Sequence, residues 1–423
     1  MASGDWGDEG GVSWGDDAPW SGGEGSSWGG EVVERSSESW ISRIGKAFVA
    51  IPIGLLLFLG SFVLLFWNEG RAVKTANGLE EGKDSVVSAA PGTIDPENDG
   101  KLVHLTGEAT VDETLKDPVF GVSARAISLR RVVEMYQWHE RSETRTRKKL
   151  GGGRERVTHY HYEKKWSGNP IQSSRFKQAA GHANPSDWPL SSWTGKARRV
   201  ALGAFTLPEA LVDQIGGPEP LAVGDSDRAG LPESVAAGLR LDGGRFYRGY
   251  DPSQPEVGDL RIFFERVSPQ VMSVLARQAG SSLEPFETQS GASIERIQSG
   301  ALSAAEMFQQ AEAENKVLTW VLRLVGFLVM AVGLMMVLSP LSVLADIVPF
   351  LGTIVGFGTG FLAFGAAMVL SLATIAISWI AVRPVLGIGL LVLAALALFA
   401  FLRRAGSRRS RPVVDPADGF RTA

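Results

Sequence analysis

Four long stretches without a charged residue constrain this chain more than any other feature. They are Ala47–Trp67, Leu324–Ala345, Ile347–Val382 and Pro384–Leu402. A bilayer core about 30 Å thick is crossed by about 20 helical residues, so the first, second and fourth stretches each predict one transmembrane pass. The third stretch is too long for one straight pass and too short for two. We place its pass at residues 352–380, after an interfacial lead-in, with a re-entrant hairpin as the alternative.

The basic residues beside these stretches predict the orientation of the chain. The arginine-rich segment 403–423 favours a cytoplasmic C-terminus, and four passes then put the N-terminus on the same side. Arg43 and Lys46 agree with this orientation, whereas Arg71 and Lys74 oppose it weakly. The expected fold class is an integral membrane α-helical protein with four passes and a large non-cytoplasmic, strand-rich α+β domain between passes 1 and 2.

The N-terminal segment 1–44 differs in composition from the rest of the chain. It repeats a Trp-Gly-acid theme, and residues 1–40 contain nine acidic residues against one basic residue, Arg35, so they carry a formal charge of −8. Low hydrophobicity, high charge and many Gly and Ser residues predict disorder. This acidic tail either engages a partner or lipid headgroups through its tryptophans, or is solvated without a specific role.

Residues 69–303 are long enough to fold as a domain of their own. The clearest pattern in them is a β-ribbon formed by 126–140 and 157–166, whose arms carry aromatic residues on one face around a Gly151-Gly152-Gly153 turn. The ribbon tip is basic, and it predicts contact with anionic headgroups or an acidic partner, or else a solvated hairpin end. Its basic residues are Arg141, Arg145, Arg147, Lys148, Lys149, Arg154 and Arg156.

A long helix is expected to join this domain to the second pass. Ser303 and Glu306 form a capping-box pattern, and no strong helix breaker follows before Pro340. We therefore predict a helix from about residue 304 to 338. It lies in the segment 304–340, which includes the second transmembrane pass. At 1.5 Å per residue this helix is roughly 50 Å long, so several turns stand outside the bilayer and tie the domain rigidly to the pass.

The chain shows no positive evidence for catalysis. It has no cysteine, which excludes disulfides, thiol catalysis and thiolate metal sites, and it lacks the usual hydrolase, metalloprotease and nucleotide-binding motifs. His159 and His161 share a strand face, but no carboxylate occupies an evident third position, so no metal or cofactor site is assigned. The net charge of −4 gives no indication of nucleic-acid binding.

The third apolar stretch contains a packing signal. Gly352, Gly356 and Gly360 recur every four residues and place three glycines on one helix stripe. Such a stripe allows another helix backbone to approach closely. It predicts either an interface between copies of the chain or packing against the chain's own passes.

The chain resembles the transmembrane protein 43 (LUMA) family over roughly residues 40–405. The resemblance is carried by motifs in family order, the strongest being the block around residues 129–138 and the Asn-Glu-Gly-Arg directly after the first pass. The motif residues are Asn68, Glu69, Gly70, Arg71, Glu134, Tyr136, Trp138, Gly258, Asp259, Arg383 and Pro384. The Gly-, Ala- and Arg-rich, cysteine-free composition favours a bacterial or otherwise non-animal member.

This resemblance implies a four-pass protein that organises membrane protein complexes and self-associates. Animal members imply the endoplasmic reticulum and inner nuclear membrane, with emerin and lamins as partners, whereas a bacterial member implies an inner-membrane protein with a periplasmic domain. A role in membrane lipid metabolism is the first alternative, and an ion channel subunit is the second. The expected partners are the lipid bilayer, further copies of the chain and other membrane proteins, without nucleic acid.

Overall fold

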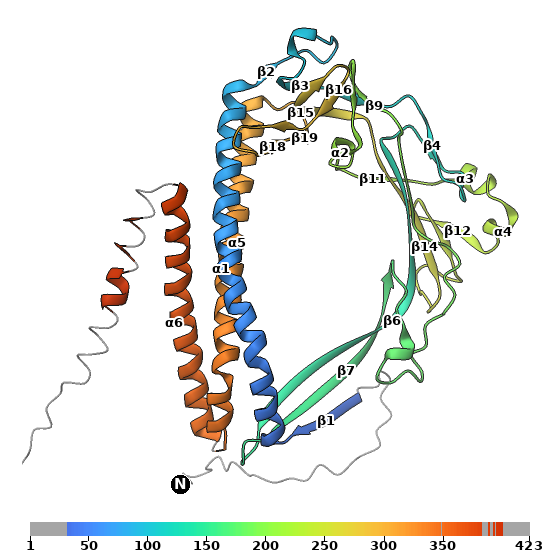
Figure 1. The fold of residues 1–423 in the computed structure, drawn as a ribbon. Coiled ribbons are helices and arrows are strands. Elements are labelled where there is room, and N and C mark those ends of the chain that lie inside the picture. Colours follow the sequence, from blue (N-terminus) through green and yellow to red (C-terminus); the bar gives the residue numbers. More distant parts are fainter. Residues whose placement is uncertain (1–31, 348, 383–387, 390–391, 394, 401–423) are drawn as a thin grey trace, which may run out of the picture.

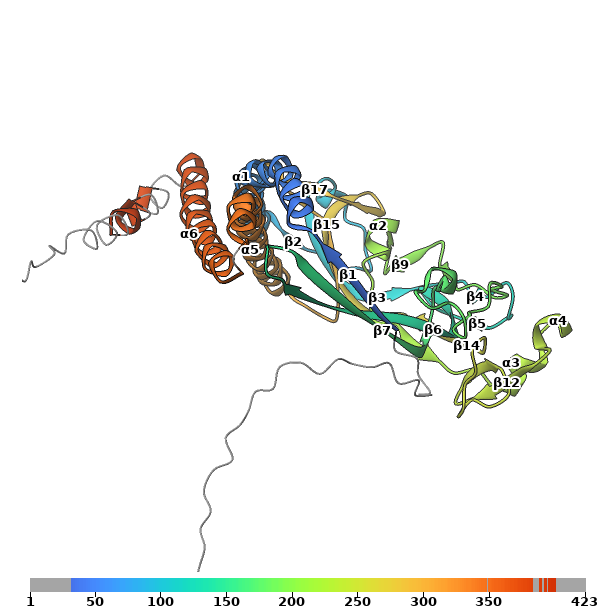
Figure 2. The same ribbon diagram turned by 90° about the horizontal axis from the view of Figure 1, so that it is seen from below.

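Three long helices and a strand-rich domain form a closed frame in this protein (Figure 1). The computed structural model describes residues 32–347, 349–382, 388–389, 392–393 and 395–400. Helices α1 (Trp40–Ser85) and α5 (Ala304–Ala345) lie side by side as a bar, and the strands arch from one end of this bar to the other. Helix α6 (Pro349–Val382) packs on the side of the bar that faces away from the arch (Figure 2). All three helices contain a window long and apolar enough to cross a membrane.

Helices α1 and α5 approach each other so closely that their backbones touch. A Cβ atom at Gly333 would lie 2.7 Å from the carbonyl oxygen of Gly54 and from the backbone nitrogen of Phe58. Small residues permit this kind of contact. In lipid the hydrophobic effect does not drive helices together, so close packing of this kind stabilises the helix pair instead. Each helix also begins at a serine cap: Ser39 accepts a hydrogen bond from Ser42, and Ser303 forms the expected capping box with Glu306.

Helix α5 continues past Pro340, where the sequence predicts a break. Proline cannot donate to the carbonyl of residue 336, which is the reason that it ends most helices. Here the Ser339 hydroxyl donates to the Met336 oxygen at 2.7 Å and replaces the missing bond. The helix therefore runs on to Ala345 and ends at Asp346.

The end of the domain next to the top of α1 and α5 is a small closed sheet. The strands pair in a ring, because β15 bonds to β3 as well as to β16. Val274 and Phe205 are fully buried inside this ring, together with Leu211 of the short helix that follows β10. The ring consists of β3 (Leu102–Thr110), β9 (Val200–Leu202), β10 (Phe205–Leu207), β16 (Ser282–Glu284) and β15 (Gln270–Ala279), with β2 (Val87–Ser88) and β19 (Arg296–Ser299) added outside it.

The second sheet forms the arch. Its residues alternate between a buried and an accessible face, as in β6, where Leu129, Val133 and Met135 are buried. Arg131 shares the buried face and forms a two-pronged ion pair with Asp117, at 2.6 and 2.7 Å. Its strands are β1 (Val32–Glu38), β7 (Arg154–Ser167), β6 (Ser128–Lys148), β14 (Leu260–Val267), β13 (Arg245–Arg248) and β12 (Leu239–Asp242) in order, with β11 (Glu219–Leu221) on β14 and β8 (Trp193–Lys196) on β6.

Short elements complete the domain. They are the strand pairs β4 (Leu115–Lys116) with β5 (Ser123–Ala124) and β17 (Phe286–Glu287) with β18 (Ser293–Ile294), the helices α2 (Glu209–Val212), α3 (Asp225–Ala229) and α4 (Glu233–Ala236), and the 3-10 helices Pro96–Asn98 and Ser173–Arg175.

The structure confirms the apolar helices and the strand-rich domain, but it does not confirm four passes. Three helices that could span a membrane occur among the described residues, and the predicted fourth pass at 384–402 is described only in part. The third stretch is one continuous helix from Pro349 to Val382, without the alternative re-entrant turn. The disorder expected at 1–44 is wrong for residues 32–44, because β1 pairs with β7 and the α1 helix begins at Trp40, while residues 1–31 lie outside the described residues.

The ribbon tip contacts the far end of the helix bar, whereas the sequence left open contact with anionic headgroups or an acidic partner, or a solvated hairpin end. Lys148 and Arg43 both donate to Asp346, whose side chain is 2% exposed. Burial opposes the ionisation of Asp346, but the hydrogen bonds from Lys148 and Arg43 outweigh it and hold the pKa of this carboxyl below its ordinary value. Gly152, with φ of +78°, lies against the Trp40 ring. We call these contacts the clasp.

The clasp predicts a disulfide between Gly151→Cys and Ile347→Cys. The backbone nitrogen of Gly151 lies 3.3 Å from the carbonyl oxygen of Ile347, which places the two residues in the range of a disulfide. Because the chain has no other cysteine, oxidation in native membranes should give one cross-linked product, read as a mobility shift on a non-reducing gel. The two single-cysteine variants serve as controls. Failure of the pair to cross-link would favour the one-sided topology predicted from the sequence.

Candidate functional site at the junction of the three helices

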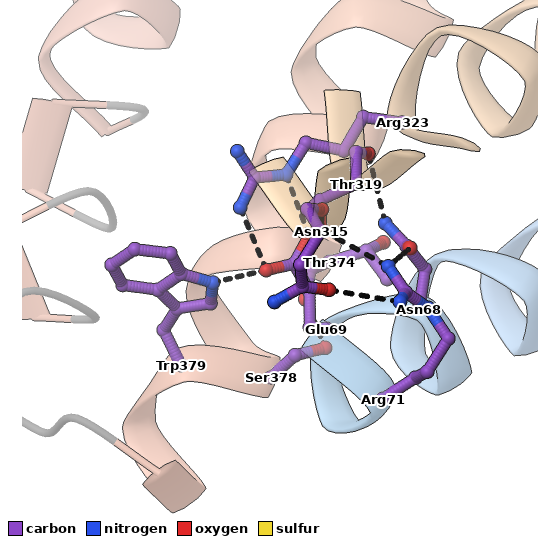
Figure 3. A network of polar contacts seen from close by, with 9 residues as sticks. All are labelled: Asn68, Glu69, Arg71, Asn315, Thr319, Arg323, Thr374, Ser378 and Trp379. Carbon is purple, nitrogen blue, oxygen red and sulfur yellow. Dashed lines mark hydrogen bonds and ion pairs between the residues drawn. The ribbon is translucent and has the colours of Figure 1, made fainter. Parts of the chain in front are cut away.

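Polar side chains from α1, α5 and α6 meet where the apolar part of α1 ends (Figure 3). Such groups are costly to bury at the edge of a membrane, so those that occur there are usually paired and functional. We call this cluster the junction. It contains Asn68, Glu69, Arg71, Asn315, Thr319, Arg323, Thr374, Ser378 and Trp379.

The centre of the junction is a carboxylate held by two helices at once. Glu69 of α1 is 1% exposed and accepts two bonds from Arg323 of α5, at 2.7 and 2.8 Å. Trp379 of α6 donates its indole N–H to the same carboxylate. The Arg323 guanidinium also lies 4.8 Å from the centroid of the Trp320 ring. The carboxylate of this one ion pair therefore contacts all three helices, and its two-pronged, charge-assisted bonds are of the strong kind.

A second set of bonds joins α1 to α5 with neutral partners. Asn68, fully buried, donates to the carbonyl oxygen of Thr319 at 3.1 Å. Arg71 donates to the Asn315 amide oxygen at 2.9 Å and to the Thr319 hydroxyl at 3.0 Å. Among the described residues Arg71 has no carboxylate partner, because Glu69 is bound to Arg323. Its hydrogen-bond partners are therefore all neutral groups.

An open groove of about 660 Å³ lies beside the Glu69–Arg323 pair. Its wall carries both signs of charge, with Lys83 bonded to Glu312 across α1 and α5. In the described part of the chain no group of three or more His, Asp or Glu side chains could hold a metal ion. The junction thus binds the three helices together and holds charge at the end of the apolar part of α1.

The other family-motif residues lie in the arch, far from the junction along the chain. Glu134 pairs with Arg261 across β6 and β14, and Tyr136 exchanges backbone bonds with Gly258 and Asp259. The Trp138 backbone is bonded on both its N–H and its C=O by the Asn184 side chain, at 2.7 and 2.9 Å. These residues hold loops onto the sheet and form no cavity of their own, so they read as structural.

The remaining predicted site residues are dispersed. Within the basic tip, Lys148 belongs to the clasp, Lys149 lies 3.5 Å from Glu155, and Arg145 lies 3.1 Å from Glu143. In the glycine stripe, a Cβ at Gly356 would make only ordinary contact with Ser342, and one at Gly360 would meet open space. The side-chain environment at Gly352, and both Arg383 and Pro384, lie outside the described residues.

Sequence reasoning found the Asn68–Arg71 motif and noted Arg323 and Trp379 singly, but it did not join them. Glu69 and Arg323 are 254 positions apart, and nothing in their spacing links them. The signal that could have linked them is their position, because each charge lies at the end of an apolar stretch and so at an edge of the membrane. Two opposite charges at the same membrane edge have a lower free energy when they are paired than when they are separate.

Comparison with known proteins identifies the family. Residues 135–384 match the family described as Transmembrane protein 43. Human Transmembrane protein 43 is 35% identical over 383 residues, which covers 88% of this chain and 93% of the human protein, and the rat protein is 35% identical over 365 residues, covering 84% and 90%. The Transmembrane protein 43 homolog of Drosophila melanogaster is 32% identical over 360 residues, covering 83% and 93%. No solved structure matches. These relatives are animal proteins, so the expectation of a non-animal member is not supported.

Removing one partner of the Glu69–Arg323 pair should destabilise the protein strongly, and removing both partners should destabilise it by less than the sum of the two single effects. Glu69→Gln or Arg323→Gln alone leaves one buried charge without its partner, so each should lower the free energy of unfolding by about 3–5 kcal/mol. The double variant Glu69→Gln/Arg323→Gln leaves no unpaired charge, and its loss of unfolding free energy should be smaller than the two single losses added together. Denaturant unfolding of detergent-solubilised protein, followed by circular dichroism, measures the cycle. Strictly additive losses would show that the two side chains do not interact.

Proposed function

Because the chain belongs to the transmembrane protein 43 family, we propose that it is a membrane scaffold that holds other membrane proteins on a rigid frame. The observation that carries this proposal is the frame itself, in which one helix pair runs through the apolar segments and into the domain. Helices α1 and α5 extend over 46 and 42 residues without a break, and are locked together by the Glu69–Arg323 pair. A rigid rod of this kind holds the domain in a fixed position relative to the membrane-spanning helices.

The upper ends of the two helices are part of the domain core, which supports the same function. Leu79 of α1, Met307 and Phe308 of α5, and Leu275 of β15 form one buried cluster. A Cβ at Gly82 would clash with Ile294 and Phe308, so the domain packs directly on the α1 backbone. Because the domain cannot rotate on its stalk without breaking this cluster, it can present partners with a surface of fixed orientation.

Self-association is part of the proposal, with the glycine stripe of α6 as the interface. In the described part of this chain Gly360 is uncovered, whereas a Cβ at Gly356 would touch Ser342 of α5, so the stripe is open to another helix at Gly360. Other membrane proteins are the expected partners, with emerin and lamins among them where the chain is found in a nuclear envelope. A role in lipid metabolism would require a pocket with converging acid and base groups, and the grooves described here do not provide one.

Blocking the stripe should reduce self-association. Gly360→Leu adds a side chain into space that is open in the single chain, so the protein should fold but its copies should no longer approach closely. Chemical cross-linking in native membranes, followed by gel analysis, should show at least a severalfold loss of oligomer. Gly365→Leu is the matched control, because its site is equally open but lies about 140° around the helix from Gly360. A strictly monomeric wild type with no co-purifying protein would refute the scaffold.

A further inference from the structure

A second groove measures about 910 Å³ and is almost entirely apolar. It lies on another face of α1 from the groove beside the Glu69–Arg323 pair, which we call the mixed-charge groove. It lies between α1 and α6, whose lining residues recur every three or four positions and so form one stripe on each helix. Aromatic residues of α1 form one wall and aliphatic residues of α6 form the other. The lining residues are Phe62, Val63, Phe66, Trp67, Gly70, Arg71, Lys74, Leu370, Ala373, Thr374 and Ile377.

Two cations that form no salt bridge among the described residues stand at one end of this groove. Arg71 is bonded only to neutral groups, and its Nε atom is buried without a hydrogen-bond partner. Lys74, one turn further on, forms no ion pair among the described residues and lies over Gly291 of the domain. No carboxylate lines the groove. The groove therefore has an apolar body and a positively charged end.

The position of this charge matches the edge of a membrane. The apolar body runs alongside the last turns of the Ala47–Trp67 stretch, and Arg71 and Lys74 follow directly after it. From Phe62 to Lys74 the groove extends over about 18 Å of helix. The positive charges of Arg71 and Lys74 attract a phosphate group, while the apolar walls suit a hydrocarbon chain.

We propose that the α1–α6 groove binds one anionic phospholipid, with its phosphate on Arg71 and Lys74 and an acyl chain between the two helices. A soluble phosphate compound would use the cations but not the apolar body, so the groove fits a lipid better than a free anion. This inference is independent of the scaffold function, since a tightly bound lipid can seal the α1–α6 contact whatever the domain does.

Gly70 provides a clean way to fill the groove. It lines the groove, and a Cβ built on it meets no atom within 4 Å. Gly70→Leu therefore places a side chain where the acyl chain would lie without displacing protein atoms. Gly60 on the same helix is equally open but does not line the groove, so Gly60→Leu is its matched control.

The experiment measures the lipid that the full-length protein retains. Purified protein is incubated in detergent with equal amounts of phosphatidylglycerol and phosphatidylcholine, and native mass spectrometry counts each bound lipid. Wild type should retain phosphatidylglycerol preferentially. Lys74→Gln should reduce this preference about fivefold, and adding Arg71→Gln should abolish it. Gly70→Leu should reduce retention of both lipids.

Two controls and two outcomes decide the proposal. Lys83→Gln, which removes a lysine of the mixed-charge groove, and Gly60→Leu should both behave as wild type. Circular dichroism checks that each variant is folded. Equal retention of the two lipids by wild type would overturn the proposal, and so would undiminished retention by folded Gly70→Leu.

Discussion

The buried ion pair between Glu69 and Arg323 is the interaction on which the rest of the structure depends. It joins α1 to α5 at the end of the apolar segment, and Trp379 brings α6 to the same point. Taking two such charges out of water is expensive, and only close two-pronged geometry with a further donor offsets the cost. The pair therefore specifies one register for the three helices. Both the domain above and the α1–α6 groove below follow from that register.

How much of this could be read from the sequence depended on the range of each interaction. The apolar stretches, the Ser303–Glu306 cap and the ribbon are local patterns, and the structure contains all three. The Pro340 break was wrong because a single serine hydroxyl compensates the lost bond. The junction could be found only in part, since Asn68–Arg71 was visible as a motif but its partners on α5 lie about 250 residues away.

The clasp imposes a condition on how lipid can surround the helices. Strand β6 carries Arg141, Arg145 and Arg147 in the part of the ribbon next to its tip, and charged side chains on an open sheet are costly to place in hydrocarbon. While Lys148 is bound to Asp346, the ribbon is held at the end of the helix bar, and α6 lies on the side of the bar turned away from it. The sides of the bar turned away from the arch are therefore those that lipid can cover at least cost.

The same condition gives the Asn68–Arg71 motif a physical reading. Asn68 and Glu69 are buried and bond to α5, and Arg71 bonds to α5 as well. Gly70 and Arg71 also line the groove between α1 and α6. A larger residue at 70 would fill the groove, and a neutral residue at 71 would remove its charge. The motif thus joins the two requirements of a membrane frame, a locked helix pair and a defined lipid contact, within a single helical turn.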